Sequence, residues 1–265
     1  MKNALRKNTF SGSFYSKECT ELKHHFKKFD TRIKTLHIKV TSIPKAVIVP
    51  HAGYIYSGFT AALAYTFCKK SKAKRVIVIG PSHHFSFKGI SGSYYEAFET
   101  PCSNIEIDSA YLFALAKKFN IGFKPQVHTK EHSTEVQMPM IQHYLSKKKV
   151  IELIYGDISV EHLSNMLIAL LNNPDNLLVI SSDLSHFHTQ HEAKKIDYHC
   201  LKAIEEQDVK HLKRSCEACG ILGMKALILA TKKKKFTSKI LKYSTSAHAN
   251  NNENSVVGYM SAIFY

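Results

Sequence analysis

The sequence predicts an α/β domain with a central, mostly parallel sheet flanked by helices, and three observations support this fold class. Short runs of Val, Ile and Leu occur at 46–50, 75–80 and 177–181; runs of this length and composition are typical of buried strands. Each run continues into Gly, Pro or Ser, where chains commonly leave a sheet. The strand–helix–strand unit over 46–80 implies a right-handed parallel crossover, so we expect neighbouring strands to run parallel.

The remaining elements follow along the chain. An amphipathic helix is expected at 17–29, with Ser16 as its cap. The segment 89–107 alternates in polarity and contains Gly and Pro, which predicts shorter strands or a hairpin. Another helix is predicted directly after Gly58. The remaining predicted helices cover 108–119, 133–146, 160–172, 192–206 and 219–231. The other predicted strands are 149–155 and the antiparallel edge strands 237–245 and 255–264. No repeat or linker divides the chain, so residues 1–265 are predicted to form a single domain.

Composition excludes several classes of protein. The 265 residues include 37 basic and 21 acidic side chains, a formal charge of +16, but the lysines are scattered and no nucleic-acid-binding signature occurs. No secretory signal and no apolar stretch of membrane-spanning length is present. The six cysteines in a chain of this size predict reduced thiols, not a disulfide framework, and hence a cytoplasmic protein.

The three strand runs each end in a cluster of histidine or acid. They lead to His51, to the pair His83 and His84, and to Asp183 and His186. Parallel sheets bind ligands outside the carboxyl ends of their strands, so these side chains should meet at one edge. This convergence is the strongest functional signal in the sequence.

The roles of these residues follow from their chemistry. A histidine after a strand, such as His51, can ligate a metal or simply cap a backbone carbonyl. Adjacent histidines point in different directions, so one of His83 and His84 is expected to ligate and the other to support it. Asp183 and His186 are three residues apart, and on a helical turn this spacing would form a catalytic carboxylate–imidazole pair.

Two imidazoles need a further donor to hold a metal, and the sequence leaves several candidates open. They are Cys219, Asp183, Glu131 and Glu135. Cys219 lies at the amino end of a predicted helix, whose dipole would favour the thiolate. A thiolate with two imidazoles suits copper, zinc or iron better than magnesium.

The segment EHSTEVQMP at 131–139 carries a second acid–imidazole cluster. Glu131, His132 and Glu135 could line the pocket, or they could form an ordinary helix start. Tyr54 could likewise form a pocket wall or pack in the core.

Several of these motifs together resemble the Memo family, which in prokaryotes is protein B of the AmmeMemoRadiSam system. They are SGSFYS at 11–16, VPHAGYIYSG, VIGPSHH, EHSTEVQMP, VISSDLSHF and Cys219-Gly220, and they span essentially the whole chain. The resemblance implies a fold related to class III non-haem-iron extradiol dioxygenases. It also implies metal ligands at His51, His83 and Cys219, with Asp183 and His186 alongside.

The family resemblance further implies iron or copper binding with redox activity. Zinc is a third candidate metal from the chemistry of the donors alone. Prokaryotic relatives imply AMMECR1-type and radical-SAM protein partners, and eukaryotic relatives imply a peptide ligand. Gln137 offers fewer donors than histidine would, and Cys219 replaces the carboxylate of the dioxygenase triad, so ring cleavage is not implied. The first two function hypotheses are a metal-dependent redox enzyme, acting on a small molecule, and a non-catalytic metal- or peptide-binding adaptor. The third is a zinc hydrolase, which the thiolate disfavours because hydrolytic zinc more often uses His and carboxylate.

Overall fold

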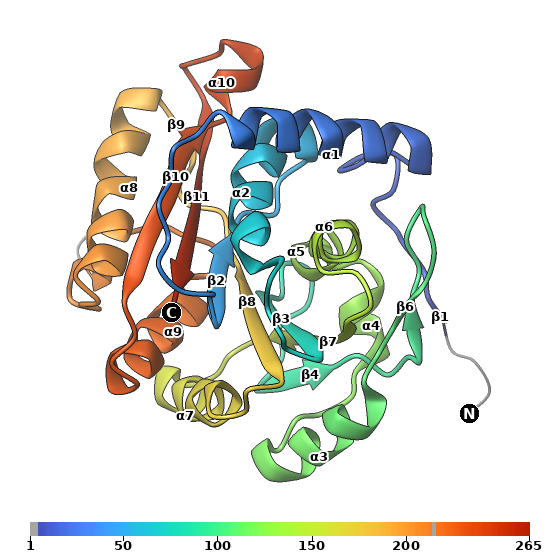
Figure 1. The fold of residues 1–265 in the computed structure, drawn as a ribbon. Coiled ribbons are helices and arrows are strands. Elements are labelled where there is room, and N and C mark those ends of the chain that lie inside the picture. The colour runs from blue at the N-terminus through green and yellow to red at the C-terminus, as the bar shows by residue number, and fades with distance from the viewer. Residues whose placement is uncertain (1–4, 214–215) are drawn as a thin grey trace.

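The computed structural model describes residues 5–213 and 216–265, and its central feature is a sheet in the strand order β10-β11-β2-β8-β3-β7-β4 (Figure 1). The four inner strands are parallel and the three outer ones are antiparallel to their neighbours. The inner strands are β2 (Ala46–Val49), β8 (Asn176–Ser181), β3 (Arg75–Pro81) and β7 (Lys149–Tyr155). The outer strands are β10 (Ser238–Thr245), β11 (Val256–Phe264) and β4 (Ile90–Gly92), and β9 (His186–His188) pairs with β11. The predicted α/β fold with a central sheet is therefore confirmed.

Helices cover both faces of the sheet because alternate side chains of each inner strand point to opposite faces. On one face, Val47 and Val49 pack against α1 (Cys19–Lys34), α2 (Phe59–Cys68) and α6 (Gln137–Tyr144). On the other face, Ile48 packs with α3 (Ser109–Phe119), α7 (Val160–Leu171), α8 (Gln190–Glu205) and α9 (Ile221–Lys233). Every residue of β2 and β8 is buried, which explains their continuous apolar sequences.

The shorter elements complete the fold. They are β1 (Leu5–Arg6), β5 (Ala97–Phe98) and β6 (Ile105–Glu106), which form a small second sheet, the π-helical turn Tyr54–Gly58, the 3₁₀ turn His211–Lys213, and the helices α4 (Pro125–Thr129), α5 (His132–Glu135) and α10 (Ala247–Asn250). The segment 89–107 thus contains short strands, as predicted. No helix among the described residues has both the length and the apolar character needed to cross a bilayer.

Three local expectations were wrong. The predicted helix 133–146 is divided into α5 and α6, and Pro139 lies just after the division, where it cannot donate a backbone hydrogen bond to an earlier carbonyl. The predicted helical turn after β8 is instead an extended loop, because Leu184 donates its backbone hydrogen bond to Gly258 of β11. Ser16 does not cap α1, since its hydroxyl donates to the Glu21 carboxylate.

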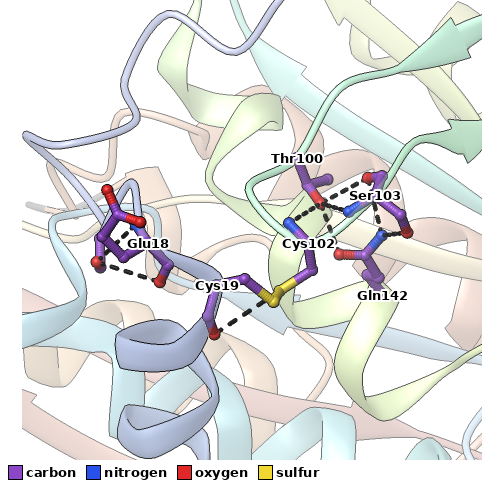
Figure 2. Close-up of a disulfide and its surroundings, with 7 residues drawn as sticks. Glu18, Cys19, Thr100, Cys102, Ser103 and Gln142 are labelled. Carbon is purple, nitrogen blue, oxygen red and sulfur yellow. Dashed lines mark hydrogen bonds between the residues drawn. A yellow bond between two sulfur atoms is a disulfide. The ribbon is translucent and has the colours of Figure 1, made fainter.

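The expectation of reduced cysteines was wrong for four of the six, which form two disulfides, whereas Cys68 and Cys219 are free thiols. Cys19 at the start of α1 is bonded to Cys102 between β5 and β6, where Gln142 and Thr100 hold the turn (Figure 2). Cys200 of α8 is bonded to Cys216. The paired residues are 83 and 16 positions apart, and sequence spacing alone does not reveal which cysteines the fold brings together. The cysteines therefore no longer support a cytoplasmic location.

Candidate metal centre

Three histidines meet at the carboxyl edge of the sheet. His51 follows β2, His83 follows β3 and His132 begins α5, and one ring nitrogen of each lies within 4.8 Å of one from each of the others. The ring centroids of His51 and His83 are 5.3 Å apart and the two planes are nearly perpendicular. His51 and His83 lie near each other because parallel strands end at the same edge of the sheet, and helix α5 adds His132 to them.

Glu131 orients His83. Its Oε1 lies 2.8 Å from His83 Nδ1, and its Oε2 accepts the His83 backbone N–H at 2.7 Å. Burial alone would raise the pKa of Glu131, but hydrogen bonds from His83 and Ser133 outweigh it and lower the pKa to about 2. An ionised Glu131 fixes the proton of His83 on Nδ1 and leaves the Nε2 lone pair free for a metal.

His51 is almost completely buried, with 1% of its surface exposed. Its Nδ1 lies 2.8 Å from Ser181 Oγ and its Nε2 lies 3.3 Å from Cys219 Sγ. Burial, with the nearby charge of His83, lowers the pKa of His51 to about 3. The pKa of His132 is lowered to about 3 chiefly by burial. Both imidazoles are therefore neutral, the form that binds metals.

Cys219 lies beside His51 but not within the mutually close set of three histidines. Its sulfur accepts a hydrogen bond from the Asp183 backbone N–H at 3.2 Å. Burial, reinforced by the Asp183 charge, raises the pKa of the Cys219 thiol to about 12. The expectation that the helix dipole would favour the thiolate was therefore wrong for the metal-free protein, because desolvation outweighs the dipole.

Asp183 acts on the backbone of the loop that follows β2. Its Oδ1 accepts the His51 backbone N–H at 2.8 Å, and burial raises its pKa to about 6. Among the described residues no hydrogen bond joins Asp183 to His186, although the His186 charge does act on the Asp183 pKa. Asp183 lies in the extended loop after β8 and His186 begins strand β9, so they do not form the helical pair that their spacing suggested.

The other predicted residues divide between the site and its surroundings. His84 is exposed, with its ring centroid 6.2 Å from that of His132. Tyr54 is buried, packs against Tyr15, and donates its hydroxyl to the Val136 carbonyl at 2.7 Å. The Glu135 carboxylate is already occupied by the N-terminal segment, so it is not positioned as a metal donor.

Sequence reasoning missed the partners of these groups. Arg6 is 1% exposed and donates to Glu135 Oε2 at 2.6 Å and to the Glu131 carbonyl at 3.1 Å. Ser181 is hydrogen-bonded to His51, and Gln137 is hydrogen-bonded to Ser181. Gln137 could have been identified from the sequence because it lies inside the motif EHSTEVQMP, whereas no feature of the sequence indicated that Arg6 is buried.

Replacing Asp183 with asparagine should stabilise the metal-free protein at neutral pH. Folding raises this pKa from 3.8 to about 6, so the carboxylate costs stability as the pH rises from about 4 to 6, and the full cost remains above pH 6. Asparagine removes that cost and can still accept from His51, so the free energy of unfolding should rise by about 3 kcal/mol at pH 7.5. The gain should disappear below about pH 4, where both states of the wild type bind the proton. Urea denaturation across this range measures the difference.

Exposed Asp157 provides the control, because Asp157→Asn should change stability by less than about 0.5 kcal/mol at every pH. A gain for Asp183→Asn that stayed constant down to pH 4 would mean that the carboxylate charge is not its cause.

The fold and this cluster define the chain as an α/β protein with a candidate transition-metal centre at the carboxyl edge of its sheet. The chain belongs to the Memo family, since the Memo-like protein family matches residues 6–263. It is 34% identical to a MEMO1 family protein of Methanobrevibacter smithii over 83% of each chain. It is 31% identical to a MEMO1 family protein of Aquifex aeolicus, over 98% of this chain and 99% of that one.

A solved structure shares the fold. The crystal structure of an uncharacterized protein from Escherichia coli K12 is 13% identical, with a TM-score of 0.55, and covers 84% of this chain and 100% of its own. This likeness concerns the fold alone.

Proposed function

We propose that this protein binds one transition-metal ion, iron or copper, through His51, His83 and Cys219. The observation that supports the proposal best is the orientation of the two imidazoles: each has Nδ1 in a hydrogen bond to another side chain, and His51 Nε2 faces the sulfur of Cys219. Ligands of one tetrahedral ion, bound at about 2.0 Å through nitrogen and about 2.3 Å through sulfur, lie roughly 3.5 Å apart. The separation of 3.3 Å between His51 Nε2 and Cys219 Sγ is close to this value.

His132 is the alternative third donor. Its ring stacks on that of His83, with centroids 4.4 Å apart and planes only 29° from parallel. Because an imidazole lone pair lies in the plane of its ring, two stacked rings direct their lone pairs side by side, which disfavours a shared ion. We therefore assign His132 to the wall of the pocket.

A bound iron or copper ion would supply redox chemistry, and zinc would supply only Lewis acidity. Around it, Asp183 has a pKa of about 6 and can hold or release a proton near neutral pH, within reach of the His51 loop. A metal-dependent redox enzyme is thus our first proposal, with AMMECR1-type and radical-SAM proteins as partners.

The second proposal, a metal- or peptide-binding adaptor, is favoured by the apolar groups beside the site. Ile55 follows the His51 loop and is 69% exposed, and Phe187, next to His186, is 79% exposed. Phe187 also has a φ of 64°, an unfavourable conformation for a bulky residue that is common at ligand clamps.

Protein purified without chelator or a nickel column should contain about one iron or copper ion per chain by elemental analysis. The double variant His51→Ala/His83→Ala should contain none, with an unchanged circular dichroism spectrum. His84→Ala, which removes an exposed imidazole from the same loop, should retain the ion. A double variant with full metal content would refute the proposed site.

A further inference from the structure

A chain of buried hydrogen bonds runs from His51 into the core. It passes through Ser181 at the end of β8 and Gln137 at the start of α6, and it ends at Tyr65 of α2. None of these four side chains is more than 1% exposed. Water cannot compete for these bonds, so each hydrogen atom in the chain must go to a protein acceptor.

The Pro50 carbonyl fixes the orientation of Gln137. A carbonyl can only accept, so the side-chain atom 2.9 Å from it must be the amide nitrogen of Gln137. The amide oxygen then accepts from the Tyr65 hydroxyl at 3.0 Å. The second hydrogen of the amide nitrogen is donated to Ser181 Oγ at 2.9 Å.

The Ser133 carbonyl then fixes the hydroxyl of Ser181. Ser181 Oγ has one hydrogen, which it donates to this carbonyl at 2.5 Å. Because Oγ accepts from Gln137 and donates to Ser133, its remaining lone pair can only accept from His51. The Nδ1 atom of His51, 2.8 Å away, must therefore carry the proton.

We propose that Ser181 and Gln137 are positioning residues that hold neutral His51 with its proton on Nδ1, so that Nε2 presents a lone pair to the metal. The role in metal binding rests on the proposed function, whereas the hydrogen-bond geometry does not. The competing arrangement is available in the structure, since a proton on Nε2 could be donated to Cys219 Sγ at 3.3 Å. That arrangement would block both donors at once, so a fixed tautomer keeps the site open.

Long-range ¹H–¹⁵N NMR of the metal-free protein at pH 8 distinguishes the two tautomers of His51 directly. The wild type should show the Nδ1–H form. Ser181→Ala should shift His51 toward the Nε2–H form and weaken Zn²⁺ binding, measured by competition with a chelator, by about 10- to 100-fold. Ser181→Thr retains the hydroxyl and should restore both the tautomer and the affinity.

Tyr65→Phe is the matched control. It removes a buried hydrogen bond from the far end of the same chain but leaves the bonds from Gln137 to Pro50 and Ser181 in place. It should leave the tautomer and the Zn²⁺ affinity unchanged.

The wild-type spectrum alone can overturn the inference, even if Ser181→Ala does not fold. An Nε2–H form of His51 in the wild type, or an unchanged tautomer in a folded Ser181→Ala variant, would refute it. An Nδ1–H form in a protein that binds no metal would refute the proposed function and leave the assignment of the positioning residues intact.

Discussion

Replacing Arg6 with methionine should lower the free energy of unfolding by about 3–5 kcal/mol at pH 7. The Arg6 guanidinium donates to Glu135 at 2.6 Å and lies 3.7 Å from Glu152, and both carboxylates are fully buried. Removing the cation leaves buried Glu135 without a charge partner and leaves buried Glu152 with His128 alone, which costs more than the ion pair itself contributes. Chemical denaturation at constant protein concentration measures the loss.

The effect of Arg6→Met should depend on pH with a definite sign. Burial raises the pKa of Glu152, but the charges of His128 and Arg6 outweigh burial and lower it from 4.5 to about 2. A carboxyl with a lowered pKa stabilises the fold above pH 4.5, and this contribution is lost as the pH falls toward 2. The difference between wild type and variant should therefore be largest above about pH 5 and become smaller on acidification.

Arg32 supplies the matched control. It is exposed and lies over the ring of Phe59, 4.1 Å from the ring centroid, so Arg32→Met removes the same charge from the surface. Its cost should stay below about 1 kcal/mol. Equal losses for the two variants would show that Arg6 acts through net charge alone.

Arg6 also connects the N-terminal segment to the candidate metal centre. The same side chain donates to the carbonyl of Glu131, whose carboxylate orients His83. Phe14, farther along this segment, packs against the His132 ring with centroids 5.1 Å apart. The segment therefore forms one wall of the site, and its motif at 11–16 has a structural reason to accompany the histidine motifs.

The sequence was sufficient to predict the sheet edge at which the histidines meet. Runs such as 46–50 are apolar throughout because both faces of the strand are covered, and this pattern is visible without a structure. The positions of His51 and His83 follow from it, because the loops after the carboxyl ends of parallel strands lie at the same edge of the sheet, here from β2 and β3 on the two sides of β8.

The features that were not predictable depend on contacts between distant segments. Arg6 resembles a surface residue in sequence and is buried only because Glu135 and Glu152 face it across the fold. The Cys219 thiol precedes a helix, which suggested a low pKa, but its burial beside Asp183 has the opposite effect. The effect of a helix dipole on a pKa can be predicted from the local sequence, whereas the effect of desolvation depends on how the whole chain packs.

Replacing the third metal donor should cause the largest loss of metal affinity among the single variants. If Cys219 is a ligand, Cys219→Ala should weaken the binding of Zn²⁺, which serves as a redox-silent probe, about a thousandfold. This factor corresponds to roughly 4 kcal/mol, because the binding free energy of about 10–16 kcal/mol is shared among three or four ligands. His132→Ala should weaken it far less, because its ring is stacked on that of His83. A larger loss of Zn²⁺ affinity in His132→Ala than in Cys219→Ala would show that His132 is the third ligand.

Proton release tests the same assignment independently of mutation. The Cys219 thiol has a pKa of about 12 and is protonated in the metal-free protein, whereas His51 and His132 have pKa values of about 3 and are neutral. Binding through the thiolate must therefore release about one proton, so the apparent affinity should rise about tenfold per pH unit between about pH 7.5 and 9. Calorimetry in buffers of different ionisation enthalpy measures this proton directly. Binding without Cys219 would leave the thiol protonated and release no proton from it, and a flat profile over that range would therefore exclude Cys219 as a thiolate ligand.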